Sequence, residues 1–116
     1  KKNKLHLVFQ PHRYTRTHVL WSDFVEVLAN SGADSLTITD IYPASEKPID
    51  NITSQALIES IKKKNPRLAA YYVPYESNLH TLKLKISELA QEGDLILLQG
   101  AGKINKIANL LTEKTS

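Results

Sequence analysis

The feature that most restricts the fold of this chain is a regular alternation of short apolar runs with longer amphipathic segments. Four short runs, at residues 5–9, 36–39, 69–73 and 95–98, have the length and composition of β-strands. After each of them, apolar residues recur at helical spacing, near residues 19–28, 53–61, 79–90 and 104–111. Gly32, Pro66 and Gly93 stand where the first three helices should end, and Thr53 or Asn51, then Ser77, where two of them should begin.

Strands that alternate with helices in this way predict an α/β domain. We expect a Rossmann-like, three-layer arrangement with a mainly parallel sheet of about four strands, flanked by helices and joined by right-handed crossovers. The unbroken apolar run at 95–98 indicates a strand that is buried on both faces. Four strands are few for such a sheet and the chain contains no methionine, so we expect residues 1–116 to form a single domain of a longer protein.

Composition excludes several classes of protein. The chain has no cysteine, which excludes a disulfide framework and a thiolate metal site and fits a cytoplasmic location. No apolar run approaches the roughly 18 residues of a membrane span. The net charge is only +3, and its one tight cluster, at 62–64, lies at the expected end of a helix. Lysines there complement the helix dipole, so we expect no nucleic-acid partner and no membrane partner.

The candidate site is expected at one edge of the sheet, because open α/β sheets bind ligands beyond the carboxyl ends of their strands. The four segments that follow the predicted strands hold most of the chemically distinctive residues. These are His12, Arg13, Tyr14 and Arg16; Asp40, Tyr42 and Glu46; Tyr75 and Glu76; and Gly100, Gly102 and Lys103.

Arg13 and Arg16 are the strongest candidates for ligand binding. They are three residues apart, so in a first helical turn they would share one face. Two guanidinium groups beside the free N–H groups of a helix N-terminus would clamp a carboxylate or phosphate. The alternative is a pair of solvated arginines.

The other candidates leave alternatives open. His12 could contact a ligand or bond to a backbone carbonyl, and Asp40 could meet a ribose hydroxyl or substrate amine, or form an Asx turn before Pro43. Glu46 could pair with an arginine or lie in solvent. Gly100 and Gly102 favour a tight turn over close approach of a ligand.

The remaining histidines, His6, His18 and His80, fit no metal motif, so we expect structural roles and no metal site. The sequence shows no Ser-His-Asp or Cys-His set arranged as a nucleophile, and it therefore predicts no catalytic residue within the chain.

Four segments in register carry a resemblance to a known family. Residues 8–17 (Val-Phe-Gln-Pro-His-Arg-Tyr-Thr-Arg-Thr), 23–28, 40–49 and 93–102 resemble the C-terminal domain of Mur ligases, in particular the members that join L-alanine to UDP-N-acetylmuramate. The family commonly has glycine where Ser45 stands and an acidic or amide residue where Lys103 stands.

The resemblance implies an ATP-dependent amide-forming ligase of peptidoglycan precursor synthesis. ATP and Mg²⁺, held mainly by a central domain, activate the muramate carboxylate as an acyl phosphate, which the amine of L-alanine attacks. In this chain Arg13 and Arg16 would hold the alanine carboxylate, and the flanking residues would be His12, Tyr14, Asp40, Tyr42 and Glu46.

The same resemblance implies that this domain packs on its own ATP-binding domain. By itself it should have no ligase activity and should bind L-alanine and ATP weakly or not at all. Two alternatives stay open: a sister Mur ligase for another amino acid or peptide, and a non-enzymatic α/β module that binds a small anion.

Overall fold

A computed structural model describes residues 3–100 of the chain. The elements follow in the order β1 (Leu5–Phe9), α1 (Tyr14–Val19), α2 (Trp21–Ala29), β2 (Ser35–Thr39), α3 (Ser54–Lys64), β3 (Ala69–Val73), α4 (His80–Leu89) and β4 (Leu95–Gln99). The alternation of strands and helices is confirmed. The helix expected at 104–111, together with Gly102 and Lys103, lies outside the described residues.

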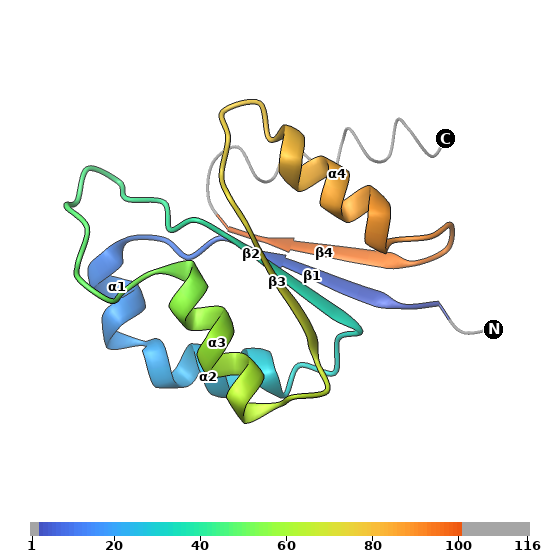
Figure 1. Ribbon diagram of the computed structural model, residues 1–116, viewed down its shortest axis with the longest axis horizontal. Coiled ribbons are helices and arrows are strands. Elements are labelled where there is room, and N and C mark those ends of the chain that lie inside the picture. Colours follow the sequence, from blue (N-terminus) through green and yellow to red (C-terminus); the bar gives the residue numbers. More distant parts are fainter. Residues whose placement is uncertain (1–2, 101–116) are drawn as a thin grey trace.

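The four strands form one sheet in the order β3-β2-β1-β4, and all of the pairings are parallel. The helices α1, α2 and α3 lie on one side of this sheet and α4 lies on the other (Figure 1). The chain thus steps outward from β1 to β3 and then crosses back to place β4 on the free side of β1. This is the expected Rossmann-like, three-layer arrangement, with its change of direction between β1 and β4.

Each face of the sheet has its own apolar core, because successive strand residues point to opposite faces. On one face Leu36 and Ile38 of β2 are fully buried against Leu57 and Ile61 of α3. On the other face Val8 of β1 packs with residues of α4, including Leu82 and Ile86.

The predicted helix at 19–28 is two helices in the structure. α1 ends at Val19 and α2 begins at Trp21, with Leu20 between them. Phe24 and Val25 pack against the core from α2 as expected, but Val19 is 77% exposed. The expectation for Val19 was wrong because the break at Leu20 removes it from the helical face that the other apolar residues share.

The helix starts were predicted in part. The Thr53 hydroxyl accepts a hydrogen bond from the backbone N–H of Ala56 at 3.1 Å and caps α3, as proposed. Ser77 does not cap α4, which begins at His80. Side-chain oxygens of Asn78 and Glu76 accept the first N–H groups of that helix instead.

The strand β4 is not buried on both faces. Ile96 and Leu98 pack against the cluster that includes α4, whereas Leu95 and Leu97 are 63% and 43% exposed. The prediction was wrong because only the face of β4 that carries Ile96 and Leu98 is covered, by α4, whereas the helices within residues 3–100 leave the other face exposed. No helix of the described part is long and apolar enough to span a membrane.

Candidate functional site

The segments that follow β1 and β2 run together beyond the sheet. His12 and Tyr42 form an isolated parallel bridge. The N–H of Tyr42 donates to the carbonyl of Pro11 at 2.9 Å, and the N–H of Arg13 donates to the carbonyl of Tyr42 at 2.7 Å. These bonds extend the β1–β2 pairing, so the sequence-predicted loops after the first two strands form one ordered unit at the carboxyl edge.

The backbone of Arg13 is fixed in an unusual conformation. Its φ of 73° and ψ of 143° belong to a region that residues other than glycine rarely adopt. The Arg13 carbonyl accepts hydrogen bonds from the N–H and the hydroxyl of Thr17 at 3.2 and 2.7 Å, and the Arg13 N–H is held by Tyr42. Because Thr17 is fully buried, these contacts anchor the residue to the body of the domain.

The guanidinium groups of Arg13 and Arg16 make no direct polar contact within residues 3–100. Both residues are exposed, and neither side chain makes a hydrogen bond or ion pair within residues 3–100. Arg13 is the N-cap residue of α1 and not part of its first turn. The helical-spacing argument for a shared face was therefore wrong, although the two residues do lie in one short segment at the carboxyl edge.

The N-terminus of α1 is occupied by the carboxylate of Glu46. One oxygen of Glu46 accepts the N–H groups of Tyr14 and Thr15 at 2.7 and 3.1 Å. The other accepts the Thr15 hydroxyl at 2.6 Å. The hydrogen bonds from Thr15, above all its hydroxyl, hold the pKa of Glu46 below its ordinary value, with a smaller contribution from the charge of Arg13.

The position of Glu46 corrects two expectations. The free N–H groups at the start of α1, expected to assist an anion clamp, are taken by a carboxylate of the chain itself. Glu46 neither forms a direct ion pair with an arginine in the described part nor lies free in solvent; it caps a helix.

A tight turn places Glu46 at the N-terminus of α1. The N–H of Glu46 donates to the carbonyl of Pro43 at 2.9 Å, and the two residues between them, Ala44 and Ser45, have φ values of 49° and 74°. Two successive positive φ values define a turn that favours glycine or asparagine. The Glu46 carboxylate thus links this turn to Tyr14 and Thr15, the two residues that directly follow Arg13.

His12 and Tyr42 stack on one another. Their ring centroids lie 5.4 Å apart at an interplanar angle of 22°. The His12 ring bonds to no backbone carbonyl in the described part, which leaves its nitrogens available. Tyr42 is 41% exposed, so the pair presents an aromatic surface beside Arg13.

Asp40 joins the tips of two strands. One carboxylate oxygen accepts the hydroxyl of Tyr72 at 2.6 Å and the other accepts the N–H of Tyr75 at 3.0 Å. Partial burial, followed by the hydrogen bond and the charge of Asp40, raises the pKa of Tyr72 to about 12. Neither carboxylate oxygen of Asp40 forms the Asx turn that was one of the two alternatives. The sequence did not predict that Asp40 would connect the end of β2 to the end of β3.

Sequence reasoning also missed Gln10. This side chain is 2% exposed and donates from Nε2 to the carbonyl of Asp40 at 3.0 Å, while its backbone N–H donates to the carbonyl of Gln99 at 2.9 Å. It connects the ends of β1, β2 and β4. A polar residue directly after a strand that is buried on both faces is the signal that could have identified it. Gly100, at the end of the described part, follows β4 at this same edge.

The opposite edge of the sheet holds a buried Ser-His-Asp series. His6 Nδ1 lies 2.7 Å from the hydroxyl of Ser35, and His6 Nε2 lies 2.8 Å from a carboxylate oxygen of Asp94. Hydrogen bonds from the N–H groups of Lys4 and Gln91, and then from His6, hold the pKa of Asp94 well below its ordinary value.

The sequence predicted no Ser-His-Asp set arranged as a nucleophile, and this buried series does not change that prediction. Ser35 and His6 are only 3% and 4% exposed, so the serine hydroxyl is not accessible to a substrate. The three residues instead fasten β1, β2 and the start of β4, which agrees with the structural role expected for His6. No group of three His, Cys, Asp or Glu side chains within residues 3–100 is placed to hold a metal ion.

Comparison of the sequence with those of known proteins identifies relatives of the chain. No family model matches the chain. Over 97% of its length the chain is 44% identical to a UDP-N-acetylmuramate–L-alanine ligase of Nitrosomonas eutropha, of which it covers 22%. It is 41% identical over 91% of its length to the enzyme of that name from Syntrophus aciditrophicus, of which it covers 21%.

A third ligase of this name, from Geotalea daltonii, is 40% identical over 96% of the chain. The chain spans about a fifth of the length of these relatives. The matches include the segments that carry Arg13, Arg16 and Glu46, since they extend over nearly the whole chain. By sequence, these matches over nearly the whole chain confirm its resemblance to the Mur ligase family, with UDP-N-acetylmuramate–L-alanine ligases as its relatives.

Proposed function

We propose that this chain is the C-terminal, amino-acid-presenting domain of a UDP-N-acetylmuramate–L-alanine ligase, acting in the cytoplasm. In the complete enzyme, Arg13 and Arg16 would bind the carboxylate of L-alanine and so direct its amine toward the activated muramate carboxyl group. The names of the relatives support this assignment, as do the two arginines at the carboxyl edge, whose side chains are unpaired within residues 3–100.

The observation that carries the proposal is the state of Arg13. Its backbone is held in a conformation that disfavours a side chain, and yet the residue carries an arginine whose guanidinium has no partner within residues 3–100. Glycine would relieve the strain, so the presence of a strained arginine supports a role for this side chain in ligand binding. Strained backbone that is fixed by its surroundings occurs preferentially at ligand-binding sites.

The neighbouring groups would set the specificity of the clamp. Glu46 neutralises the start of α1 and leaves the arginine side chains as the cations offered to an anion. A guanidinium group binds a carboxylate through two parallel hydrogen bonds. His12 and Tyr42 would line the same site, and Tyr14 and Asp40 would support it from within the fold.

ATP and Mg²⁺ belong to the remainder of the enzyme in this proposal. The described residues offer no cluster of metal ligands, so we assign no step of metal chemistry to them. When bound, ATP would supply the phosphoryl group that activates the muramate carboxylate. This chain would contribute the position and orientation of the attacking amine, and it would close over the ATP-binding domain to exclude water.

The test uses the full-length enzyme with Arg13→Ala and Arg16→Ala as single variants. Each lost bidentate contact should raise the KM for L-alanine by roughly 10- to 100-fold, since a hydrogen bond to a charged group contributes about 1.5–3 kcal/mol. The KM for ATP should change less than about twofold. Arg67→Ala is the matched control, because Arg67 is exposed on the segment that enters β3, at the other edge.

If both variants leave the KM for L-alanine unchanged, the arginines do not bind the amino acid and the assignment is wrong. A sister ligase is the second candidate, and measuring turnover with glycine, L-serine and D-glutamate in place of L-alanine distinguishes it. A preference for another amino acid would retain the ligase class and reject the proposed substrate.

A further inference from the structure

The strand β3 has a free edge. Within the described sheet β3 pairs only with β2, so its other side has no strand partner there. Along a parallel strand every second residue directs its N–H and C=O groups away from the neighbouring strand. The free side of β3 therefore presents unpaired backbone donors and acceptors, which is the template for adding another strand.

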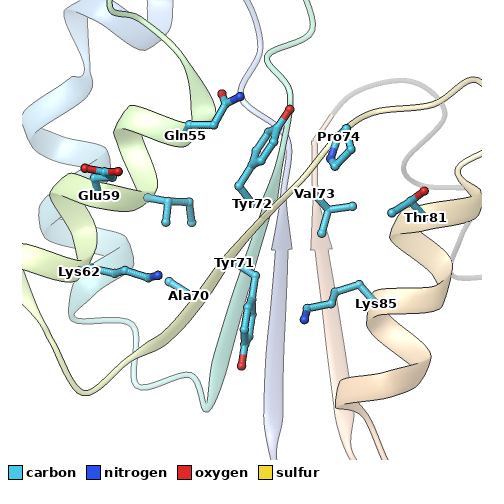
Figure 2. A pocket seen from close by; sticks show the side chains of 11 residues that line it. Gln55, Glu59, Lys62, Ala70, Tyr71, Tyr72, Val73, Pro74, Thr81 and Lys85 are labelled. Atoms are coloured by element: carbon cyan, nitrogen blue, oxygen red, sulfur yellow. The ribbon is translucent and has the colours of Figure 1, made fainter.

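This edge lies at the bottom of a groove. A cavity of about 460 Å³ runs along Ala70 to Pro74 and is walled on one side by α3 and on the other by α4. The α3 wall consists of Gln55, Ile58, Glu59 and Lys62, and the α4 wall of Thr81 and Lys85. Figure 2 shows Lys62 and Lys85 pointing toward β3 from opposite sides.

The strand itself carries none of the usual protection against edge pairing. The residues of β3, Ala-Ala-Tyr-Tyr-Val, include no charge and no proline, and both protective devices are common on exposed edges. The charged side chains that line the groove lie on α3 and α4 instead. The Nζ atom of Lys85 lies over the ring of Tyr71, 4.0 Å from the ring centroid. This contact holds the ammonium group against the ring and away from the β3 backbone.

The charges of the groove favour an acidic ligand. Lys62 is exposed and has no ion-pair partner among residues 3–100, and Lys85 has one exposed partner, Glu88, at 3.2 Å. Glu59 is the one acidic side chain that lines the groove. The two lysines on opposite walls thus outnumber the carboxylates that face the same space.

We propose that the β3 edge binds an extended acidic peptide segment of a partner protein as an added strand. Side chains of an added strand alternate between the two walls. Acidic residues next to each other would therefore reach Lys62 on one side and Lys85 on the other, while backbone hydrogen bonds form with β3. This surface is independent of the proposed ligase function, since it uses none of the residues assigned to alanine binding.

The test is a binding titration of the 116-residue chain with a fluorescein-labelled peptide, Thr-Val-Glu-Glu-Val-Thr. Binding should weaken about tenfold or more in the double variant Lys62→Glu/Lys85→Glu. It should change less than about twofold in Lys63→Glu/Lys83→Glu, which alters the net charge equally on the same two helices but outside the groove. A peptide with proline in place of both valines should lose binding.

Hydrogen exchange separates strand addition from simple charge attraction. In the complex the outward amides of β3 should exchange more slowly, while those of β1 are unchanged. The proposal is overturned if the peptide binds without protecting β3, if the two double variants weaken it equally, or if the proline peptide binds as well as the parent. A chain that sediments as a β3-paired dimer and excludes the peptide would also overturn it.

Discussion

Replacement of Arg13 by glycine should make the fold more stable and the site inactive. An L-residue at the observed φ of 73° and ψ of 143° costs about 1–3 kcal/mol. Glycine removes this strain but loses about 0.5–1 kcal/mol more backbone entropy on folding. The net gain should lie between about 0 and 2.5 kcal/mol, and a gain of about 1 kcal/mol would raise Tm by roughly 3–6 °C for a domain of this size.

Arg13→Ala is the matched control, because alanine removes the guanidinium and keeps the strain. It should leave Tm within about 1 °C of the parent chain. Both variants should raise the KM for L-alanine in the full-length enzyme by a similar factor. Thermal unfolding followed by circular dichroism measures the stability difference. If Arg13→Gly is no more stable than Arg13→Ala, the backbone of Arg13 is not strained and the structural argument for its functional role fails.

Three further predictions concern contacts that hold the site and the sheet. Ser45→Gly should stabilise the chain by about 0.5–1 kcal/mol in chemical denaturation, because φ is 74° at this turn position; a loss of stability would contradict the turn geometry. Thr53→Ala should cost about 1 kcal/mol through loss of the α3 cap, whereas Thr53→Ser should cost much less. In the folded state the pKa of Asp94 lies below its ordinary value of 3.8. The stability that its ionised carboxylate contributes is therefore fully present above pH 3.8 and is lost as the pH falls from there through the folded-state pKa. Asp94→Asn should therefore lower Tm at pH 7 and weaken the acid dependence of Tm between pH 5 and about 2; an unchanged acid profile would reject this role.

The local elements could be predicted because their signals lie within a few residues. Apolar patterns with periods of about 2 and 3.6 residues located all four described strands and two of the described helices. The hydroxyl of Thr53, which caps α3, marked the start of that helix. The rule that ligands bind beyond the carboxyl ends then placed Arg13, His12 and Glu46 at one edge. The break at Leu20 was missed because apolar spacing continues across it.

The contacts that define the candidate site could not be predicted, because their partners are far apart in the chain. Glu46 and Tyr14 are 32 residues apart, and Asp40 and Tyr72 are also 32 apart. Which loop meets which depends on the strand order and on the face that each crossover takes. A carboxylate that caps a neighbouring helix and one that binds a ligand are identical in the sequence.

The sequence by itself therefore determined the strands and most of the helices, the parallel architecture and the edge of the sheet at which chemistry is expected. Only the tertiary structure decided the strand order, the one-sided exposure of β4, the capping of α1 by Glu46 and the partly buried hydrogen bond between His6 and Asp94, residues that are 88 positions apart. The physical reason is that backbone periodicity is a local property, whereas the partner of a polar group is fixed by the packing of the whole domain.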